Sequence, residues 1–229
     1  MLISINDLDY EEGKVKYEDV KLEQLLERTP SKKIVPFYFE IIRGSLIDAD
    51  ILASSKENIL DLLIPDIEKA ETRIKNTEEE LEKVLMEKVI SVLEEETPLS
   101  EKEWTEAERD KLRALGMLTM KPVVKVDKDT PIQEFLKRAI EVAKIIFFYT
   151  AGPREIHAWD MKQGATAVEC AGKIHSDFEK GFVRADVVAF EDYLECHSMN
   201  DAKSKGLAKL VEKDFVISDG DIVEIRSGI

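Results

Sequence analysis

The sequence predicts an α+β protein with three parts, and three stretches of the chain support this. The first 64 residues mix helical and strand patterns, and residues 59–117 have helical spacing of apolar residues with no strand pattern. From residue 145 onward, most segments have the pattern of strands bounded by turn residues. A chain of 229 residues has room for one or two domains with hydrophobic cores. We therefore expect a small α/β sheet, a helical arm and a C-terminal strand-rich domain.

The N-terminal part is expected to contain a helix at residues 20–28 and a strand at Lys33–Ile42. This strand is rich in β-branched and aromatic residues. A further strand at Pro122–Val126 is expected to return to the same sheet. We assign residues 1–64 and 118–144 together to one truncated α/β domain.

The middle part, residues 65–117, is expected to form an antiparallel helical hairpin. Thr77 followed by Glu80 has the spacing of a capping box, and the same spacing recurs at Ser100 with Glu103 and at Thr105 with Glu108. The acidic runs of this arm are interpreted as solvated helix surface, with a protein-docking face as the alternative.

The C-terminal part, residues 145–229, has the strand and helix order of a β-grasp, the ubiquitin-like roll. A helix at Ala165–Ile174 is expected between its second and third strands. The expected strands are Ile145–Thr150, Glu155–Asp160, Val183–Phe190, Phe215–Ser218 and Asp221–Arg226. A Ser218-Asp219-Gly220 turn is expected to join the last two of these strands.

Composition excludes several classes of protein. The chain has 33 Lys and Arg against 48 Asp and Glu, a net charge of −15, which argues against a DNA-binding or generic nucleic-acid-binding protein. Any RNA contact must therefore be local. No apolar run approaches the ~20 residues of a membrane span. The two cysteines, Cys170 and Cys196, are expected to be reduced thiols of a cytoplasmic protein.

Motifs for catalysis and metal binding are missing from the sequence. No phosphate-binding loop or dinucleotide fingerprint is present. The possible metal ligands are Cys170 with His175, Cys196 with His197, and His157, and none has the paired spacing of a zinc site. A Cys and His nucleophilic pair could form only in space, because nothing orients one in the sequence. We therefore predict no catalytic, cofactor or metal-binding residues.

The C-terminal sequence carries a resemblance to a known family. The segment Thr150–Tyr193, TAGPREIHAWDMKQGATAVECAGKIHSDFEKGFVRADVVAFEDY, with the later KDFVISDGDIVEIR, resembles the TGS domain that closes the YchF subfamily of Obg-related P-loop NTPases. Upstream, LTMKPVV and DIEKAETRI resemble the strand that leaves the family's helical arm and the helix that enters it. The segment Lys14–Gly44 resembles the family's second and third G-domain strands with the helix between them.

The departures from the family concern its nucleotide-binding elements. The family's first strand, phosphate loop and first helix have no counterpart that we recognise. Ile41 stands where the switch aspartate belongs, and the sequence VDKDT replaces an Asn-based base-recognition motif after Pro122–Val126. Because phosphoryl transfer depends on positioning by these elements, we expect a degenerate relative that is not an enzyme and takes no cofactor.

The resemblance implies a non-catalytic, TGS-domain binding protein that acts in translation, with the ribosome or ribosomal RNA as partner. The candidate partner-binding residues are Arg154, His157, Lys173, Lys180 and Arg184. His157 stands where the family usually has Arg, and ordinary surface charge explains the four cations equally well. One alternative is a protein adaptor that uses the acidic arm or a β-grasp edge strand. The other is residual ATP or GTP binding by the remnant sheet.

Overall fold

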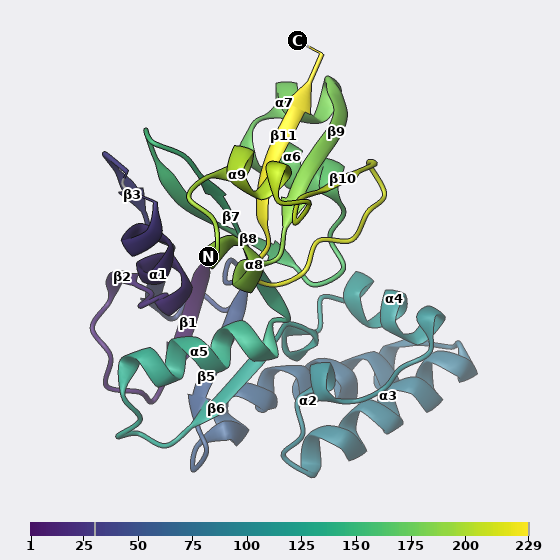
Figure 1. Ribbon diagram of the computed structural model, residues 1–229. Coiled ribbons are helices and arrows are strands. Elements are labelled where there is room, and N and C mark those ends of the chain that lie inside the picture. The colour runs from purple at the N-terminus through teal and green to yellow at the C-terminus, as the bar shows by residue number, and fades with distance from the viewer. Residues whose placement is uncertain (30, 229) are drawn as a thin grey trace. The chain divides into compact units, whose positions relative to one another are not determined.

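The computed structural model describes residues 1–29 and 31–228. Pro30 and Ile229, the last residue of the predicted C-terminal domain, lie outside the described residues. The chain folds into two compact units (Figure 1). The N-terminal unit consists of Met1–Val15 and Phe39–Ala143, and the C-terminal unit consists of Lys16–Tyr38 and Lys144–Ile229.

The N-terminal unit contains a five-stranded sheet in the order β2-β4-β1-β5-β6. Its strands are β1 (Leu2–Asn6), β2 (Gly13–Lys16), β4 (Tyr38–Arg43), β5 (Ile51–Ser55) and β6 (Val123–Val126). The central strand β1 runs parallel to both β4 and β5, and β5 runs parallel to β6. Every residue of β5 is buried, which is typical of a parallel strand covered on both faces.

The central strand β1 was not predicted from the sequence. Its register places Ile3 beside Ile41 of β4 and Ile51 of β5. The sequence LISIN is short, and the polar residues Ser4 and Asn6 interrupt its apolar pattern. A strand signal of this length is therefore weak until neighbouring strands bury it.

The helical arm, which the sequence analysis treats as a part of its own, belongs to the N-terminal unit. Its helices are α2 (Ile59–Asn76), α3 (Glu80–Glu94) and α4 (Glu106–Ala114), with 3₁₀ turns η1 (Leu99–Glu101) and η2 (Leu118–Met120). Helices α2 and α3 lie side by side (Figure 1) and share an apolar core that includes Leu63, Ala70, Met86 and Val89. A further helix, α5 (Ile132–Val142), packs on β6.

The capping box predicted at Thr105 and Glu108 forms. Thr105 Oγ1 accepts from the Glu108 backbone N–H at 3.3 Å, and Glu108 Oε2 accepts from the Thr105 N–H at 2.8 Å. At α3 the N-cap is Glu79 instead, and its N–H donates to Thr77 Oγ1 at 3.2 Å. The pattern at Thr77 and Glu80 therefore marked the right place but the wrong capping contact.

The C-terminal unit contains a six-stranded sheet in the order β10-β9-β11-β7-β8-β3. Its strands are β3 (Ile34–Val35), β7 (Ile145–Ala151), β8 (Ile156–Lys162), β9 (Phe182–Val188), β10 (Lys209–Val211) and β11 (Ile222–Ser227). Strands β7 and β8 form an antiparallel hairpin, and β11 runs parallel to β7 and antiparallel to β9. The helices are α1 (Val20–Arg28), α6 (Ala167–Ile174), α7 (Ser176–Lys180), α8 (Phe190–Leu194) and α9 (Met199–Ser204).

Two expected strands differ in the structure. The stretch Lys33–Ile42 is divided, because its beginning forms β3 in the C-terminal sheet and its end lies in β4 of the N-terminal sheet. Pro36, which lacks a backbone N–H, follows β3 directly. The stretch Phe215–Ser218 forms a single bridge, between Val216 and Thr166, and not a strand.

The divided stretch changes the predicted domain boundaries. Residues 16–38, which the sequence predicts to be part of the N-terminal domain, instead belong to the C-terminal unit. Helix α1 contacts β8, and β3 pairs in parallel with β8, with Ile34 opposite Ile156. Each unit thus combines helices with one sheet, and the chain as a whole is a mixed α/β protein with two sheets. None of the described helices is long and apolar enough to cross a membrane.

Candidate functional site

The five predicted partner-binding residues all lie in the C-terminal unit. His157 is the most buried of the five. Its ring stacks on Trp159 with 3.6 Å between centroids, and its Nδ1 lies 3.2 Å from Glu155 Oε1. Burial lowers the pKa of His157, while the nearby Glu155 carboxylate opposes this shift. His157 is therefore a stacked, mainly neutral ring at neutral pH and not a surface cation.

The lowered pKa of His157 can be tested directly in solution. We expect His157 to titrate below the usual histidine pKa of about 6.5, because the folded environment disfavours the imidazolium. Its contribution to stability is then present above the unfolded-state pKa and is lost as the pH falls through the folded-state pKa. An NMR titration of the imidazole protons of wild type against His157→Gln checks this. A His157 pKa at or above the usual histidine value of about 6.5 would contradict the prediction.

The remaining candidates do not form one cluster. Lys173 of α6 makes a salt bridge to Asp160 of β8 at 2.9 Å, and this places Lys173 near the His157 strand. Arg184 lies on β9 and pairs with Glu212 at 3.2 Å. Strands β11 and β7 separate β9 from β8, so Arg184 is roughly 14 Å from β8 across the sheet, at about 4.8 Å per strand.

Arg154 and Lys180 have the most available charges of the five. Arg154 lies in the turn between β7 and β8, and Lys180 ends α7, and both side chains are exposed. Within residues 1–29 and 31–228 neither makes a salt bridge. The predicted cations are therefore of two kinds, paired and unpaired. Only the three-dimensional structure distinguishes the two kinds.

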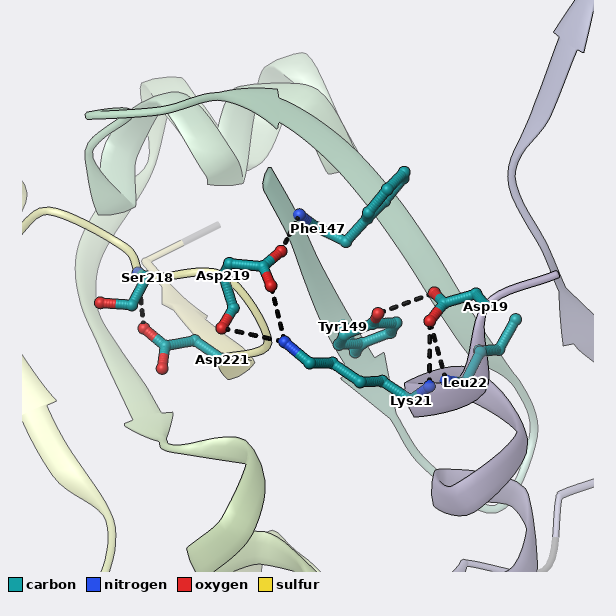
Figure 2. Close-up of polar contacts among 8 residues, drawn as sticks. All are labelled: Asp19, Lys21, Leu22, Phe147, Tyr149, Ser218, Asp219 and Asp221. Carbon is teal, nitrogen blue, oxygen red and sulfur yellow. Dashed lines mark hydrogen bonds and ion pairs between the residues drawn. The ribbon is translucent and has the colours of Figure 1, made fainter. Parts of the chain in front are cut away.

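A polar clamp that the sequence analysis did not identify joins α1 to the rest of the C-terminal unit (Figure 2). Asp19 is the N-cap of α1, and its Oδ1 accepts from the backbone N–H groups of Lys21 and Leu22 at 3.1 and 3.3 Å. Its Oδ2 accepts from the Tyr149 hydroxyl of β7 at 2.7 Å. Asp19 and Tyr149 are both buried, and burial is the main cause that raises the pKa of each.

The second half of the clamp is the turn before β11 (Figure 2). Asp219 accepts from the Phe147 N–H at 2.9 Å and from Lys21 Nζ at 2.6 Å. Asp221 accepts from the Ser218 N–H at 2.8 Å, and burial raises its pKa. The predicted turn at Ser218-Asp219-Gly220 thus forms. Gly220 adopts a φ of 99°, a backbone conformation that favours glycine.

The chemistry of the clamp is structural. Each of its carboxylates accepts hydrogen bonds from donors of the chain itself, and no group of metal-ligating side chains gathers anywhere in the described residues. Cys170 and Cys196 are free and buried, and burial raises the pKa of Cys170 to about 12, so its thiol is unreactive at neutral pH. A signal for part of the clamp exists in the sequence, because Asp immediately before an apolar helical stripe marks an N-cap.

A separate polar cluster lies at the carboxyl edge of the N-terminal sheet, where open α/β sheets bind ligands. Asp7 follows β1 with a φ of 52°. Its Oδ2 accepts from Ser55 Oγ at 3.0 Å, from Lys128 Nζ at 2.7 Å and from Asn58 Nδ2. The contact with Lys128 is the main cause that lowers the pKa of Asp7. The donors at this edge therefore converge on a carboxylate of the chain itself.

Comparison with known proteins places the similarity in the C-terminal region. Residues 145–227 match the family model YchF-GTPase_C, described as "Protein of unknown function (DUF933)". The ribosome-binding ATPase YchF of Bacillus subtilis is 39% identical over 102 residues, which cover 44% of this chain and 28% of that protein. Its Haemophilus influenzae counterpart is 44% identical over 82 residues, 36% of this chain and 23% of that protein.

Two further comparisons extend this result. Human Obg-like ATPase 1 is 38% identical over 92 residues, which cover 40% of this chain and 23% of that protein. The chain thus matches about a quarter of the length of its curated relatives. The structure of the Schizosaccharomyces pombe YchF GTPase has a TM-score of 0.76 at 17% identity, and the alignment covers 99% of this chain and 97% of that one. At this identity the likeness concerns the fold alone.

The names of these relatives correct one expectation. We expected a protein that is not an enzyme, but the relatives are named ATPases and the structural neighbour a GTPase, and both names point to an enzyme family. The motif absences therefore do not establish a non-enzymatic protein. The comparisons support a relationship of this chain to the YchF family, and residues 145–227 carry that relationship.

Proposed function

We propose that this chain acts at the ribosome and that its C-terminal unit makes the contact. The observation that carries this proposal is the 39–44% identity between the C-terminal region and two proteins named as ribosome-binding ATPases. The net charge of −15 requires the contact with ribosomal RNA to be local, because an acidic chain is repelled from phosphates in general. A cytoplasmic location follows from such a partner.

The strand order of the C-terminal unit supports the interpretation of a TGS-type β-grasp. A hairpin of β7 and β8 comes first, then α6, then β9, and finally β11 returns between β9 and β7. Helix α6 packs against β8 and β9, and its residues Cys170 and Ala171 contribute to the buried core. The opposite face at β7 is also covered, because Phe147 and Tyr149 are buried there against the segment around α1. Binding in this proposal is therefore assigned to the loops and the exposed side chains.

The unpaired cations Arg154 and Lys180 are the strongest candidates for an RNA contact in this proposal. Lys173 and Arg184 would first have to leave Asp160 and Glu212. Both salt bridges are partly exposed, and exposed pairs are worth at most about 1 kcal/mol, so this exchange is inexpensive. His157 contributes through its stacked ring and not through charge.

Co-sedimentation of the full chain with ribosomes tests the proposal. We expect binding that weakens as salt rises from about 50 to about 200 mM, and that weakens by about tenfold when Arg154→Gln and Lys180→Gln are combined. Lys102→Gln with Lys137→Gln, two exposed positions of the N-terminal unit, is the matched control. Failure to co-sediment at low salt would contradict ribosome association. Binding that resists both salt and nuclease would instead favour the protein adaptor.

Nucleotide binding is the second candidate function, because the fold is similar to that of a YchF GTPase and the relatives are named ATPases. The carboxyl edge of the parallel sheet is the expected place. In this proposal Asp7 must release its donors before they can meet a phosphate group. A rise in melting temperature on addition of ATP or GTP with magnesium would support it, and an unchanged midpoint at millimolar nucleotide would contradict it.

A further inference from the structure

A hollow of about 500 Å³ lies in the N-terminal unit, next to the helical arm. Its apolar walls are formed by Ile47 from the loop after β4 and by Met117, Leu118 and Met120 after α4. This volume is within the range of pockets that hold small organic molecules. Methionine side chains suit such a wall, because they are flexible and adapt to the shape of a ligand.

The hollow is built into the fold by a buried carboxylate. Asp66 of α2 is fully buried and accepts from the Leu118 N–H at 2.7 Å. It also accepts from the Thr119 N–H at 2.8 Å and the Thr119 hydroxyl at 2.7 Å. These bonds fix the turn η2, and therefore the wall that Leu118 and Met120 form, before any ligand arrives.

A lysine fixes the opposite wall. Lys121 Nζ donates to the carbonyl oxygens of Leu46 at 2.9 Å and Ala49 at 2.8 Å, and also to that of Ile47. Ile47 is 80% exposed, although the loop around it is held in this way. An exposed isoleucine on a fixed loop, beside an apolar hollow, is a surface that a ligand can cover at little entropic cost.

The charges around the hollow are all of one sign. Lys69, Arg113 and Lys121 line it, and no Asp or Glu does, in a chain whose net charge is −15. Lys69 Nζ donates to the Gly116 carbonyl at 2.7 Å, which leaves two of its three N–H groups available. Within residues 1–29 and 31–228, neither Lys69 nor Arg113 makes a salt bridge. An anion in this position would meet two cations without displacing a carboxylate.

From this combination we propose that the hollow binds a small organic anion with an apolar body. The apolar part lies against Ile47, Leu118 and the methionines, and the anionic group faces Lys69 and Arg113. Neither part suffices alone, because exposed cations bind simple anions weakly and the apolar walls do not select for charge. The residues of this hollow belong to the N-terminal unit, and none of them is among the residues proposed for the ribosome contact.

Calorimetry of the full chain with three probes that share an eight-carbon body tests the proposal. Octanoate is expected to bind at one site with a Kd below about 2 mM, and about fivefold or more tightly than octan-1-ol and octyltrimethylammonium. Acetate, which carries the charge without the body, is expected not to bind measurably. No ribosome is present, so the result does not depend on the function proposed above.

Variants locate the binding. Arg113→Gln should weaken octanoate binding by about threefold, and Ile47→Asp by about tenfold, because it removes an apolar wall and adds a like charge at the mouth. Both side chains are exposed, so both variants should fold, which circular dichroism checks. Lys102→Gln is the matched control and should bind as wild type does. The proposal is overturned by absence of saturable octanoate binding, by equal binding of the cationic probe, or by unchanged affinity in both variants.

Discussion

Replacement of Asp66 with alanine is expected to lower the free energy of unfolding of the N-terminal unit by about 3 to 4 kcal/mol. The carboxylate is fully buried and accepts three hydrogen bonds from Leu118 and Thr119. Without it, two backbone N–H groups and one hydroxyl lose their acceptor in the interior, and each buried polar group without a partner costs roughly 1 to 3 kcal/mol. Partial relaxation of η2 toward water offsets part of this cost.

Urea denaturation followed by circular dichroism measures this loss. Glu68→Ala, an exposed carboxylate on the same helix, is the control and should change stability by less than about 0.5 kcal/mol. The stability of Asp66→Asn should lie between those of wild type and Asp66→Ala. The amide keeps one acceptor oxygen but places an NH₂ donor against the backbone N–H groups. Equal stability of Asp66→Ala and Glu68→Ala would show that the buried carboxylate holds no structure.

Replacement of Asp19 with alanine is expected to destabilise the C-terminal unit by about 2 to 3 kcal/mol. The change removes the N-cap of α1, worth about 1 kcal/mol, and leaves the buried Tyr149 hydroxyl without its acceptor. The cost of burying the carboxylate, which raises the pKa of Asp19, offsets part of this contribution. Glu27→Ala, at an exposed position of the same helix, is the matched control.

A double-mutant cycle of Asp19→Asn and Tyr149→Phe isolates the contact between the two side chains. We expect a coupling energy of about 1 to 2 kcal/mol, whereas additive effects would mean that the hydrogen bond contributes nothing. The pH dependence has a definite sign. Because the folded-state pKa of Asp19 is raised, its titration favours the folded state below the ordinary aspartate pKa. The difference between wild type and Asp19→Ala should therefore shrink as pH rises through the raised pKa.

The parts of the fold that the sequence predicted well rest on local signals. Thr105 and Glu108 are three residues apart and form their capping box as expected. The turn at Ser218-Asp219-Gly220 needs a glycine at a positive φ, and the sequence supplies one there. Long helical stripes in the arm likewise identify their own buried face. In each case the residues that decide the conformation lie within a few positions of one another.

The errors concern contacts between distant residues. Ile34 pairs with Ile156, and Asp19 meets Tyr149, which lies 130 residues further along the chain. No local pattern can show that the segment carrying Ile34 leaves one sheet for another. The division of Lys33–Ile42 follows from which neighbouring strand can satisfy its backbone groups, and that depends on tertiary packing.

For the candidate sites, the sequence by itself determined which residues carry a charge or an aromatic ring, such as Arg154, His157 and Lys173. It also showed that the region around these residues resembles a known family. Only the tertiary structure decided that His157 is stacked and neutral and that Lys173 is held by Asp160. The physical reason is that the charge and availability of a side chain depend on burial and on partners brought close by the fold. The type of a residue sets which interactions its side chain can make, and its neighbours in the fold decide which of those interactions it makes.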